Sequence, residues 1–329
     1  LVLLVLKLSA NMDTIQDGVG LMNINSLVDK YYLSSDFNML ADKTKVDYSN
    51  CLSVMLNTKI DDKFVYTTKV NKLTGAVARQ SYEVWLKRGI YIANHICATS
   101  RKVYSFGMEM GYAETNPFST FKCKVTKPRK VTWTKEQIMQ LLDFCYADFQ
   151  YRSLGLIVQM AYEWCQRIGD MRLLQFDSID YDKKILNLEQ SKRGATVHLP
   201  ISDDLLEMLI QQKDDYSFQK YVAPYPKALR GSYKPYTLTR LSIVARRAMN
   251  LCGLPDELRI ADLRRTGTTE MVEAGVSMGQ IMSVTGHANP QSVKPYMKNT
   301  LDSAKNALTI RKKYDISTDN VPNKELYNI

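Results

Sequence analysis

Five side chains suited to phosphodiester chemistry occur in order along the sequence: Arg167, Lys192, Arg264, His287 and Tyr296. Breaking a DNA strand without losing its bond energy requires three things: a nucleophile that holds the phosphate, cations that neutralise charge on the non-bridging oxygens, and an acid that protonates the departing 5′ oxygen. Two arginines, a lysine and a tyrosine can supply these functions. Taken singly, each residue has an ordinary explanation as an ion pair, a turn residue or a buried polar group, and the chain has 20 tyrosines. The prediction therefore depends on the surrounding motifs.

Each candidate lies in a short motif, and the motifs follow one another along the chain. They are Cys165-Gln166-Arg167-Ile168-Gly169-Asp170-Met171, Gln190-Ser191-Lys192-Arg193-Gly194, Asp262-Leu263-Arg264-Arg265-Thr266 and Thr285-Gly286-His287, with Tyr296 nine positions after His287 (296 − 287). This series resembles the conserved boxes of the tyrosine recombinase (phage integrase) family, and the second motif looks closest to the lambda-type integrases. One box is a weak signal, whereas five in order are specific. The stretch from Ala93 to Phe118 also resembles the end of that family's core-binding domain, so the resemblance covers residues 27–313.

The resemblance implies a role for each candidate. Tyr296 would be the nucleophile that becomes linked to DNA, and Lys192, on a β-hairpin turn, would be the general acid. Arg167 and Arg264 would bind the scissile phosphate through planar, bidentate hydrogen bonds, which a lysine could imitate only as a point charge. His287 would donate a hydrogen bond to a phosphate oxygen. No metal or other cofactor is expected.

Two further positions qualify this assignment. Asp170 lies one helical turn from Arg167 and would orient its guanidinium without touching the phosphate. The family's second box opens with a histidine three residues before its arginine, and here that position (264 − 3) is Ala261. An alanine methyl group neither accepts nor donates a proton, so the resemblance leaves open which group accepts the proton of Tyr296. We expect weakened rather than abolished activity.

The predicted fold is mainly α-helical with a small antiparallel sheet (α+β), arranged as a two-domain clamp around duplex DNA. The predicted divisions are an N-terminal extension (1–24), a helical, SAM-like core-binding domain (25–120), a basic linker (121–132), a tyrosine recombinase catalytic domain (133–313) and a C-terminal tail (314–329). A chain of 329 residues is long enough for two domains of ordinary size.

Local patterns predict several elements within these domains. Apolar residues at helical spacing, from Ile92 to Met110, predict a helix over 90–110 that Asn116 and Pro117 stop. Thr134 with Gln137 three residues later predicts a capping box at the start of the second domain. Alternating apolar residues predict two strands between residues 184 and 200, with Gly194 supplying a positive φ in the turn. A last helix is expected from Leu301 to about residue 313.

The charge balance favours a polyanionic partner. The chain has 44 Lys and Arg against 34 Asp and Glu, a net charge of +10. Five of the cations lie within nine residues of the linker, which suits a strap laid across a phosphate backbone. The predicted DNA-binding residues are Arg101, Lys122, Lys124, Lys127, Arg129 and Lys130. For Arg101 a solvated helix face is an equally good interpretation.

Compartment and partners follow from composition and from the resemblance. The six cysteines show no paired spacing that indicates a disulfide framework or zinc site, and the apolar stretch Leu1–Leu6 is too short for a membrane span. We therefore expect a cytoplasmic protein, and the resemblance implies a bacterial or archaeal host and a nucleoid association. It also implies double-stranded DNA with attachment or core sites as the partner, a homotetramer on two sites, and possible DNA-bending accessory proteins. Two alternatives stay open: a type IB topoisomerase or telomere resolvase, and a DNA-binding relative that has lost catalysis.

Overall fold

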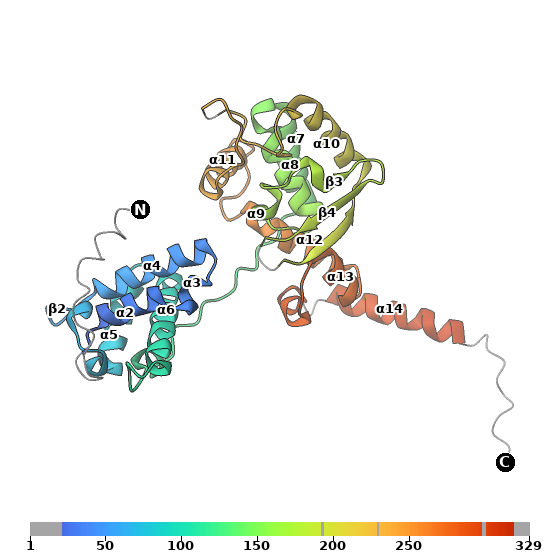
Figure 1. Ribbon diagram of the computed structural model, residues 1–329. Coiled ribbons are helices and arrows are strands. Elements are labelled where there is room, and N and C mark those ends of the chain that lie inside the picture. Colours follow the sequence, from blue (N-terminus) through green and yellow to red (C-terminus); the bar gives the residue numbers. More distant parts are fainter. Residues whose placement is uncertain (1–21, 192–193, 229, 298–300, 319–329) are drawn as a thin grey trace, which may run out of the picture. The chain divides into compact units, whose positions relative to one another are not determined.

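The structure is a computed structural model that describes residues 22–191, 194–228, 230–297 and 301–318 of the chain. The chain divides into two compact units, residues 1–129 (unit 1) and residues 130–329 (unit 2) (Figure 1). This division falls inside the segment 121–132 that the sequence predicts as a linker. The apolar stretch Leu1–Leu6 and the tail beyond residue 318 lie outside the described residues.

Unit 1 is built from helices, most of which bury one face. They are α2 (Ile24–Leu33), α3 (Ser35–Asn38), α4 (Asp42–Leu56), α5 (Gly75–Leu86) and α6 (Ile90–Glu109), with a short hairpin of β1 (Lys59–Ile60) and β2 (Lys63–Phe64). The helix predicted over 90–110 is confirmed as α6, which buries Ile96, Val103 and Tyr104 in the core. On the same face, a Cβ at Gly107 would lie 3.0 Å from the side chain of Leu27, so glycine at 107 lets α2 approach α6 closely.

Two details of unit 1 differ from the sequence prediction. Helix α6 ends at Glu109, followed by Gly111 at φ +73°, so the helix stops before Asn116 and Pro117 are reached. Asn116 instead caps a 3₁₀ turn, Pro117–Ser119. The segment 59–64 forms the β1–β2 hairpin, which the sequence analysis did not predict.

Unit 2 packs helices around a central helix and a three-stranded sheet. The helices are α7 (Lys135–Ala147), α8 (Phe149–Glu163), α9 (Ile168–Met171), α10 (Asp203–Tyr216), α11 (Leu238–Leu251), α12 (Leu263–Glu273), α13 (Met278–Thr285) and α14 (Leu301–Thr318). Residues 154–161 of α8 are all buried, which places α8 in the middle of the unit. The capping box of Thr134 and Gln137 is confirmed at the start of α7.

The predicted hairpin is confirmed as β4 (Ile185–Glu189) and β5 (Thr196–Pro200), paired antiparallel with Leu186 opposite Leu199. A third strand that the sequence did not reveal, β3 (Ile179–Asp180), pairs with β4. Helix α14 runs to Thr318 and is thus longer than predicted. The mainly helical fold with small antiparallel sheets is as expected. Within the described residues, no helix is both long and apolar enough to span a membrane.

Candidate active site

Close backbone packing brings Arg167 and Arg264 to the same region of unit 2. Arg167 follows the end of α8, where Cys165 adopts φ +51° and turns the chain into α9. Arg264 lies in the first turn of α12, and α12 meets the end of α8 at Gly267. A Cβ at Gly267 would lie 2.6 Å from the Cys165 sulfur and 2.8 Å from the Tyr162 carbonyl oxygen. A larger residue at 267 would therefore push the two arginine-bearing segments apart.

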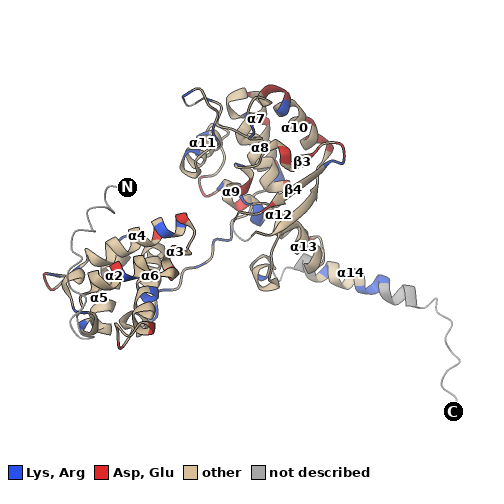
Figure 2. Ribbon diagram, in the orientation of Figure 1, with Lys and Arg blue, Asp and Glu red and all other residues tan. Residues whose placement is uncertain are grey.

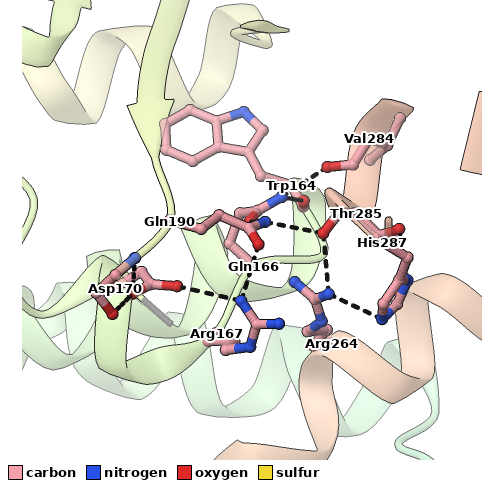
Figure 3. Close-up of polar contacts among 10 residues, drawn as sticks. Trp164, Gln166, Arg167, Asp170, Gln190, Arg264, Val284, Thr285 and His287 are labelled. Carbon is pink, nitrogen blue, oxygen red and sulfur yellow. Dashed lines mark hydrogen bonds and ion pairs between the residues drawn. The ribbon is translucent and has the colours of Figure 1, made fainter. Parts of the chain in front are cut away.

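Arg264 is a buried cation at the centre of the site, with only 8% of its surface exposed. Its Nη2 donates to the carbonyl oxygen of Thr285 at 2.9 Å and lies 3.0 Å from Nε2 of His287 (Figure 3). Burial and, secondarily, the nearby Arg167 cation lower the pKa of the Arg264 guanidinium to about 10. The group therefore stays charged at neutral pH. Its Nη1 is buried and has no hydrogen-bond partner among the described residues.

The hydrogen bonds of Thr285 assign the tautomer of His287. The Thr285 hydroxyl donates to the carbonyl oxygen of Ile281 at 2.7 Å, and the same oxygen lies 2.7 Å from Nδ1 of His287. Because the hydroxyl proton is already used, Nδ1 carries the ring proton and donates it to Thr285. Nε2 then presents a lone pair that accepts the hydrogen bond from Arg264.

Two buried glutamines hold Arg167 and the end of α13. The carbonyl oxygen of the Gln190 side chain accepts a hydrogen bond from Arg167 Nη1 at 2.8 Å (Figure 3). The Gln190 amide nitrogen donates to Gln166 Oε1 at 2.7 Å and to the Thr285 carbonyl oxygen at 2.8 Å. Gln166 in turn donates to two main-chain carbonyl oxygens. Both glutamine residues are fully buried, and each side-chain N–H has an acceptor.

Asp170 occupies the place predicted for it, one turn along α9 from Arg167. Its Oδ2 lies 3.8 Å from Arg167 Nη1, and its side chain is 2% exposed. Its other oxygen accepts hydrogen bonds from the backbone N–H, at 3.3 Å, and the hydroxyl of Ser191. The carboxylate therefore also fixes the start of the hairpin turn, a contact that the sequence did not reveal.

Tyr296 lies beside these groups in the same subunit. It ends a 3₁₀ turn, Lys294–Tyr296, and its ring centroid is 6.0 Å from that of His287. The guanidinium of Arg265, which the sequence left without a role, lies over the tyrosine ring at 5.4 Å from the centroid. The electrostatic influence of Tyr296 raises the pKa of the Arg264 guanidinium, against the larger lowering by burial. Four of the five candidates are thus brought together.

Comparison with known families agrees with this arrangement. The sequence profile of the phage integrase family matches residues 132–302, more than half of the chain. The chain belongs to the phage integrase family. A tyrosine recombinase, XerA, of Pyrococcus furiosus is 24% identical over 188 residues, which are 56% of this chain and 63% of the relative. The chain therefore matches less than two thirds of the length of that relative.

Solved structures with the same fold include integrases. A lambda integrase dimer bound to a COC′ core site has a TM-score of 0.69 at 16% identity, covering 91% of this chain and 86% of the other. The Tn1549 transposon integrase in complex with a circular intermediate DNA has a TM-score of 0.70 at 14% identity, covering 88% and 99%. At such low identity the likeness establishes the shared fold.

Lys192, the fifth candidate of this integrase family member, lies outside the described residues, as does Arg193. The turn that carries them is described on both sides. Gln190 donates its backbone N–H to the Ala195 carbonyl oxygen at 2.9 Å, and its own carbonyl accepts from Gly194 at the same distance. Gly194 has φ +63°, as the turn prediction required. In the sequence, Lys192 follows Gln190 by two positions.

Ala261 is exposed in the 3₁₀ turn Ile260–Asp262 that leads into α12. It lies three residues before the buried Arg264, which is in the first turn of α12. An exposed alanine leaves room for a larger side chain at this position. Alanine in place of the family's histidine therefore removes an imidazole at 261, and the position has room for a histidine side chain.

The linker of this family member presents its lysines to solvent while its backbone is held by unit 1. Lys122, Lys124, Lys127 and Lys130 are exposed, and Arg129 is half-buried. Figure 2 shows Lys and Arg in blue along this segment. The Tyr82 hydroxyl accepts a hydrogen bond from the backbone N–H of Lys124 at 2.8 Å, and the Asn94 side-chain amide donates to the carbonyl oxygen of Lys124 at 2.9 Å. In unit 2, the backbone N–H of Trp133 donates to the Thr266 hydroxyl at 3.0 Å.

Arg101 is engaged within unit 1. Its Nε and Nη2 both donate to the carbonyl oxygen of Phe118, at 3.1 and 2.7 Å, and the Asn116 amide donates to the Arg101 carbonyl oxygen at 2.8 Å. These bonds tie the 3₁₀ turn Pro117–Ser119 to α6. The geometry favours a structural role for Arg101 over the predicted DNA contact.

The roles of Gln190, Gln166 and Thr285 were missed by the sequence analysis, although the motifs contain them. One signal was available for Gln190. Alternation along β4 places residue 190 on the same inward face as Leu186 and Leu188, which are both buried. A polar side chain at an inward position requires buried hydrogen-bond partners, and here that position lies directly before the candidate catalytic turn.

Proposed function

We propose that this protein is a site-specific DNA recombinase that cuts and rejoins DNA strands through a covalent 3′-phosphotyrosyl intermediate. The observation that carries the proposal is the convergence, in one subunit, of Arg167, Arg264, His287 and Tyr296. The buried Nη1 of Arg264 adds support. An unsatisfied buried N–H is unfavourable, and a phosphate oxygen would satisfy it.

In the proposed reaction, the Tyr296 phenol oxygen attacks phosphorus as its proton passes to solvent or a nearby base. The bond to the 5′ oxygen breaks, and Lys192 gives that oxygen a proton. Arg167 and Arg264 neutralise the charge on the non-bridging oxygens, while His287 holds the Arg264 guanidinium in place through the hydrogen bond at Nε2. The free 5′ hydroxyl of a partner strand then attacks the phosphotyrosine and releases the phenol, so rejoining needs no ATP and no metal.

The proposed partner is duplex DNA, supported by the net charge of +10 and the exposed linker lysines. The structural relatives include a lambda integrase tetramer bound to a Holliday junction, with a TM-score of 0.68 at 17% identity. A homotetramer on two DNA sites, with α14 and the tail 314–329 docking on a neighbouring subunit, follows by analogy. A tail-deleted protein that still forms stable two-site complexes would refute the docking. DNA-bending accessory proteins and a cytoplasmic, nucleoid-associated location in a bacterial or archaeal cell belong to the same proposal.

The test is a covalent adduct. The protein is incubated with a pool of nicked duplexes of randomised sequence, in which cleavage releases a short strand and traps the adduct, and the products are separated in SDS. Tyr296→Phe should abolish the adduct and leave salt-sensitive DNA binding intact. Tyr225→Phe is a matched control, since Tyr225 also lies in unit 2 under a guanidinium, that of Arg240 at 5.1 Å. An adduct that survives Tyr296→Phe would refute the proposal.

A DNA-binding relative without catalysis is the second candidate, and Ala261 is the observation that favours it. Binding with no adduct at any protein concentration would select this candidate. A type IB topoisomerase would form the adduct and relax supercoiled DNA, but would not join strands from two separate duplexes. Strand exchange between two labelled duplexes therefore distinguishes the recombinase from both alternatives.

A further inference from the structure

The side chain of Gln190 connects the two arginines of the site through consecutive hydrogen bonds. Arg167 Nη1 donates to Gln190 Oε1 at 2.8 Å, and Gln190 Nε2 donates to the Thr285 carbonyl oxygen at 2.8 Å. The same carbonyl oxygen accepts Nη2 of Arg264 at 2.9 Å. One amide and one carbonyl oxygen therefore set the relative position of two guanidiniums that reach the site from α9 and α12.

The amide of Gln190 is chemically suited to this position. Its oxygen accepts from a cation, and its two N–H groups donate to Gln166 and to Thr285, so its donors are both used. It is also neutral, so it orients Arg167 without cancelling the charge that a phosphate would meet. A carboxylate at residue 190 would place negative charge in this buried position and would repel both acceptor oxygens.

The surroundings hold Gln190 in this one arrangement. It is fully buried, and a Cβ on Gly286 would lie 2.5 Å from its amide nitrogen. Its backbone forms both hydrogen bonds that close the turn before Ala195. Arg167, by contrast, keeps 26% of its side chain exposed and so remains accessible to a ligand.

We propose that Gln190 is a positioning residue that sets both guanidiniums in register for a single phosphate. The inference rests on the proposed function and deepens it: Gln190 touches neither DNA nor the reacting atoms, and acts through Arg167 directly and through Arg264 by way of the Thr285 carbonyl. Its loss should leave DNA affinity nearly unchanged, because many phosphate contacts share that affinity. Cleavage should slow by about 10- to 100-fold, as is usual when a group that orients a catalytic ligand is removed.

The chain offers a matched control in Gln212 of α10. Gln212 is also fully buried, accepts from Arg152 Nε at 2.8 Å, and donates to Ser153 Oγ at 3.3 Å and to the Val222 carbonyl oxygen at 2.9 Å. None of these partners is a candidate site residue. Gln212→Met and Gln190→Met thus remove the same kind of buried amide, and only the second is linked to the arginines of the site.

The experiment measures single-turnover cleavage of a nicked duplex below the melting temperature of every variant. Three versions of the scissile phosphate are compared: the natural diester, a methylphosphonate and a 5′-bridging phosphorothiolate. A methylphosphonate is uncharged, so it reduces the need for aligned cations. A phosphorothiolate leaves as a thiolate without a proton, so it bypasses the general acid. Arg167→Ala and Lys192→Ala serve as references for the two patterns.

We expect Gln190→Met to cleave the diester at least about 10-fold more slowly than the parent, with this deficit shrinking on the methylphosphonate and persisting on the phosphorothiolate. Gln212→Met should lower the melting temperature similarly and cleave all three substrates like the parent. If Gln190→Met does not fold, Gln190→Asn, which keeps an amide but shortens its reach to Arg167 and to Thr285, should show the same substrate pattern.

Three results would overturn the inference. The folded Gln190 variant could cleave the diester at the parental rate, or Gln212→Met could show an equal loss of cleavage rate. The third is that the phosphorothiolate substrate, and not the methylphosphonate, restores cleavage by the Gln190 variant. The last would mean that residue 190 acts through the lysine turn. Failure of the parent protein itself to form an adduct would instead refute the proposed function.

Discussion

Substitution of Gly286 by alanine should damage stability and activity together, for reasons that the structure makes quantitative. Gly286 follows α13 in the left-handed conformation at φ +68°, between the Thr285 carbonyl and His287. A Cβ there would lie 2.5 to 2.9 Å from the amide atoms of Gln190. Since Gln190 is buried and hydrogen-bonded on both sides of its amide, it cannot move aside without breaking those bonds.

Two terms add up for Gly286→Ala. The left-handed conformation costs a residue with a Cβ about 1–2 kcal/mol, and overpacking a buried contact costs about 1–3 kcal/mol more. The expected loss in free energy of unfolding is therefore roughly 2–5 kcal/mol. Gly253→Ala isolates the first term, because Gly253 has φ +71° and no atom within 4 Å of its Cβ position. That control should lose only roughly 1–2 kcal/mol.

Urea unfolding followed by tryptophan fluorescence measures both losses, since Trp133 and Trp164 report on unit 2 and Trp85 on unit 1. Single-turnover cleavage should fall in Gly286→Ala and stay at the parental rate in Gly253→Ala. Equal destabilisation of the two variants, with equal cleavage, would show that Gln190 yields to the methyl group without consequence. The Gln190 amide would then not be held rigidly.

Other predictions address the departure at 261, the basic residues and the role of metal. Ala261→His should speed cleavage by up to ~100-fold, because a positioned imidazole assists proton transfer; an unchanged single-turnover rate would contradict the expected role. Replacing Lys122 and Lys124 by alanine should reduce the slope of log K against log salt by about 0.9 per lysine in anisotropy titrations. Arg101→Ala should leave that slope unchanged and lower the melting temperature of unit 1, and the reverse pattern would place its guanidinium on DNA. Adduct formation should continue in EDTA, because two guanidiniums supply the charge, and dependence on added Mg²⁺ would refute this.

The sequence predicts the elements well wherever a pattern is local. The capping box of Thr134, the β4–β5 hairpin and the helix that became α6 each depend on residues close together along the chain. The residues that stop α6 were misassigned, because Gly111, in the left-handed conformation, acts before the proline does. The short strands β1 and β3 have two residues each, too few for alternation to be visible.

In the site too, the sequence predicts what local motifs carry and misses what depends on tertiary contacts. Spacing and residue type select Arg167, Arg264, His287 and Tyr296, which the structure brings together. The hydrogen bonds among them could not be read from the sequence, because they join Gln190 to a main-chain carbonyl 95 positions away. Arg101 shows the converse limit: its charge suggested a DNA contact, which stays a prediction, while its hydrogen bonds to the Phe118 carbonyl depend on tertiary packing that the sequence does not show.

The acceptor shared by Arg264 and Gln190 belongs to the main chain of Thr285, and every amino acid carries that carbonyl group. Random mutation at codon 285 can remove the hydroxyl that orients His287, yet it cannot delete the oxygen that anchors the guanidinium. Variants of this protein should therefore tolerate replacement at 285 with partial loss, whereas altering the path of the backbone at the neighbouring glycine would disturb the whole anchor. In directed evolution, substitutions at position 285 should therefore be recovered among active variants, and substitutions at position 286 should not.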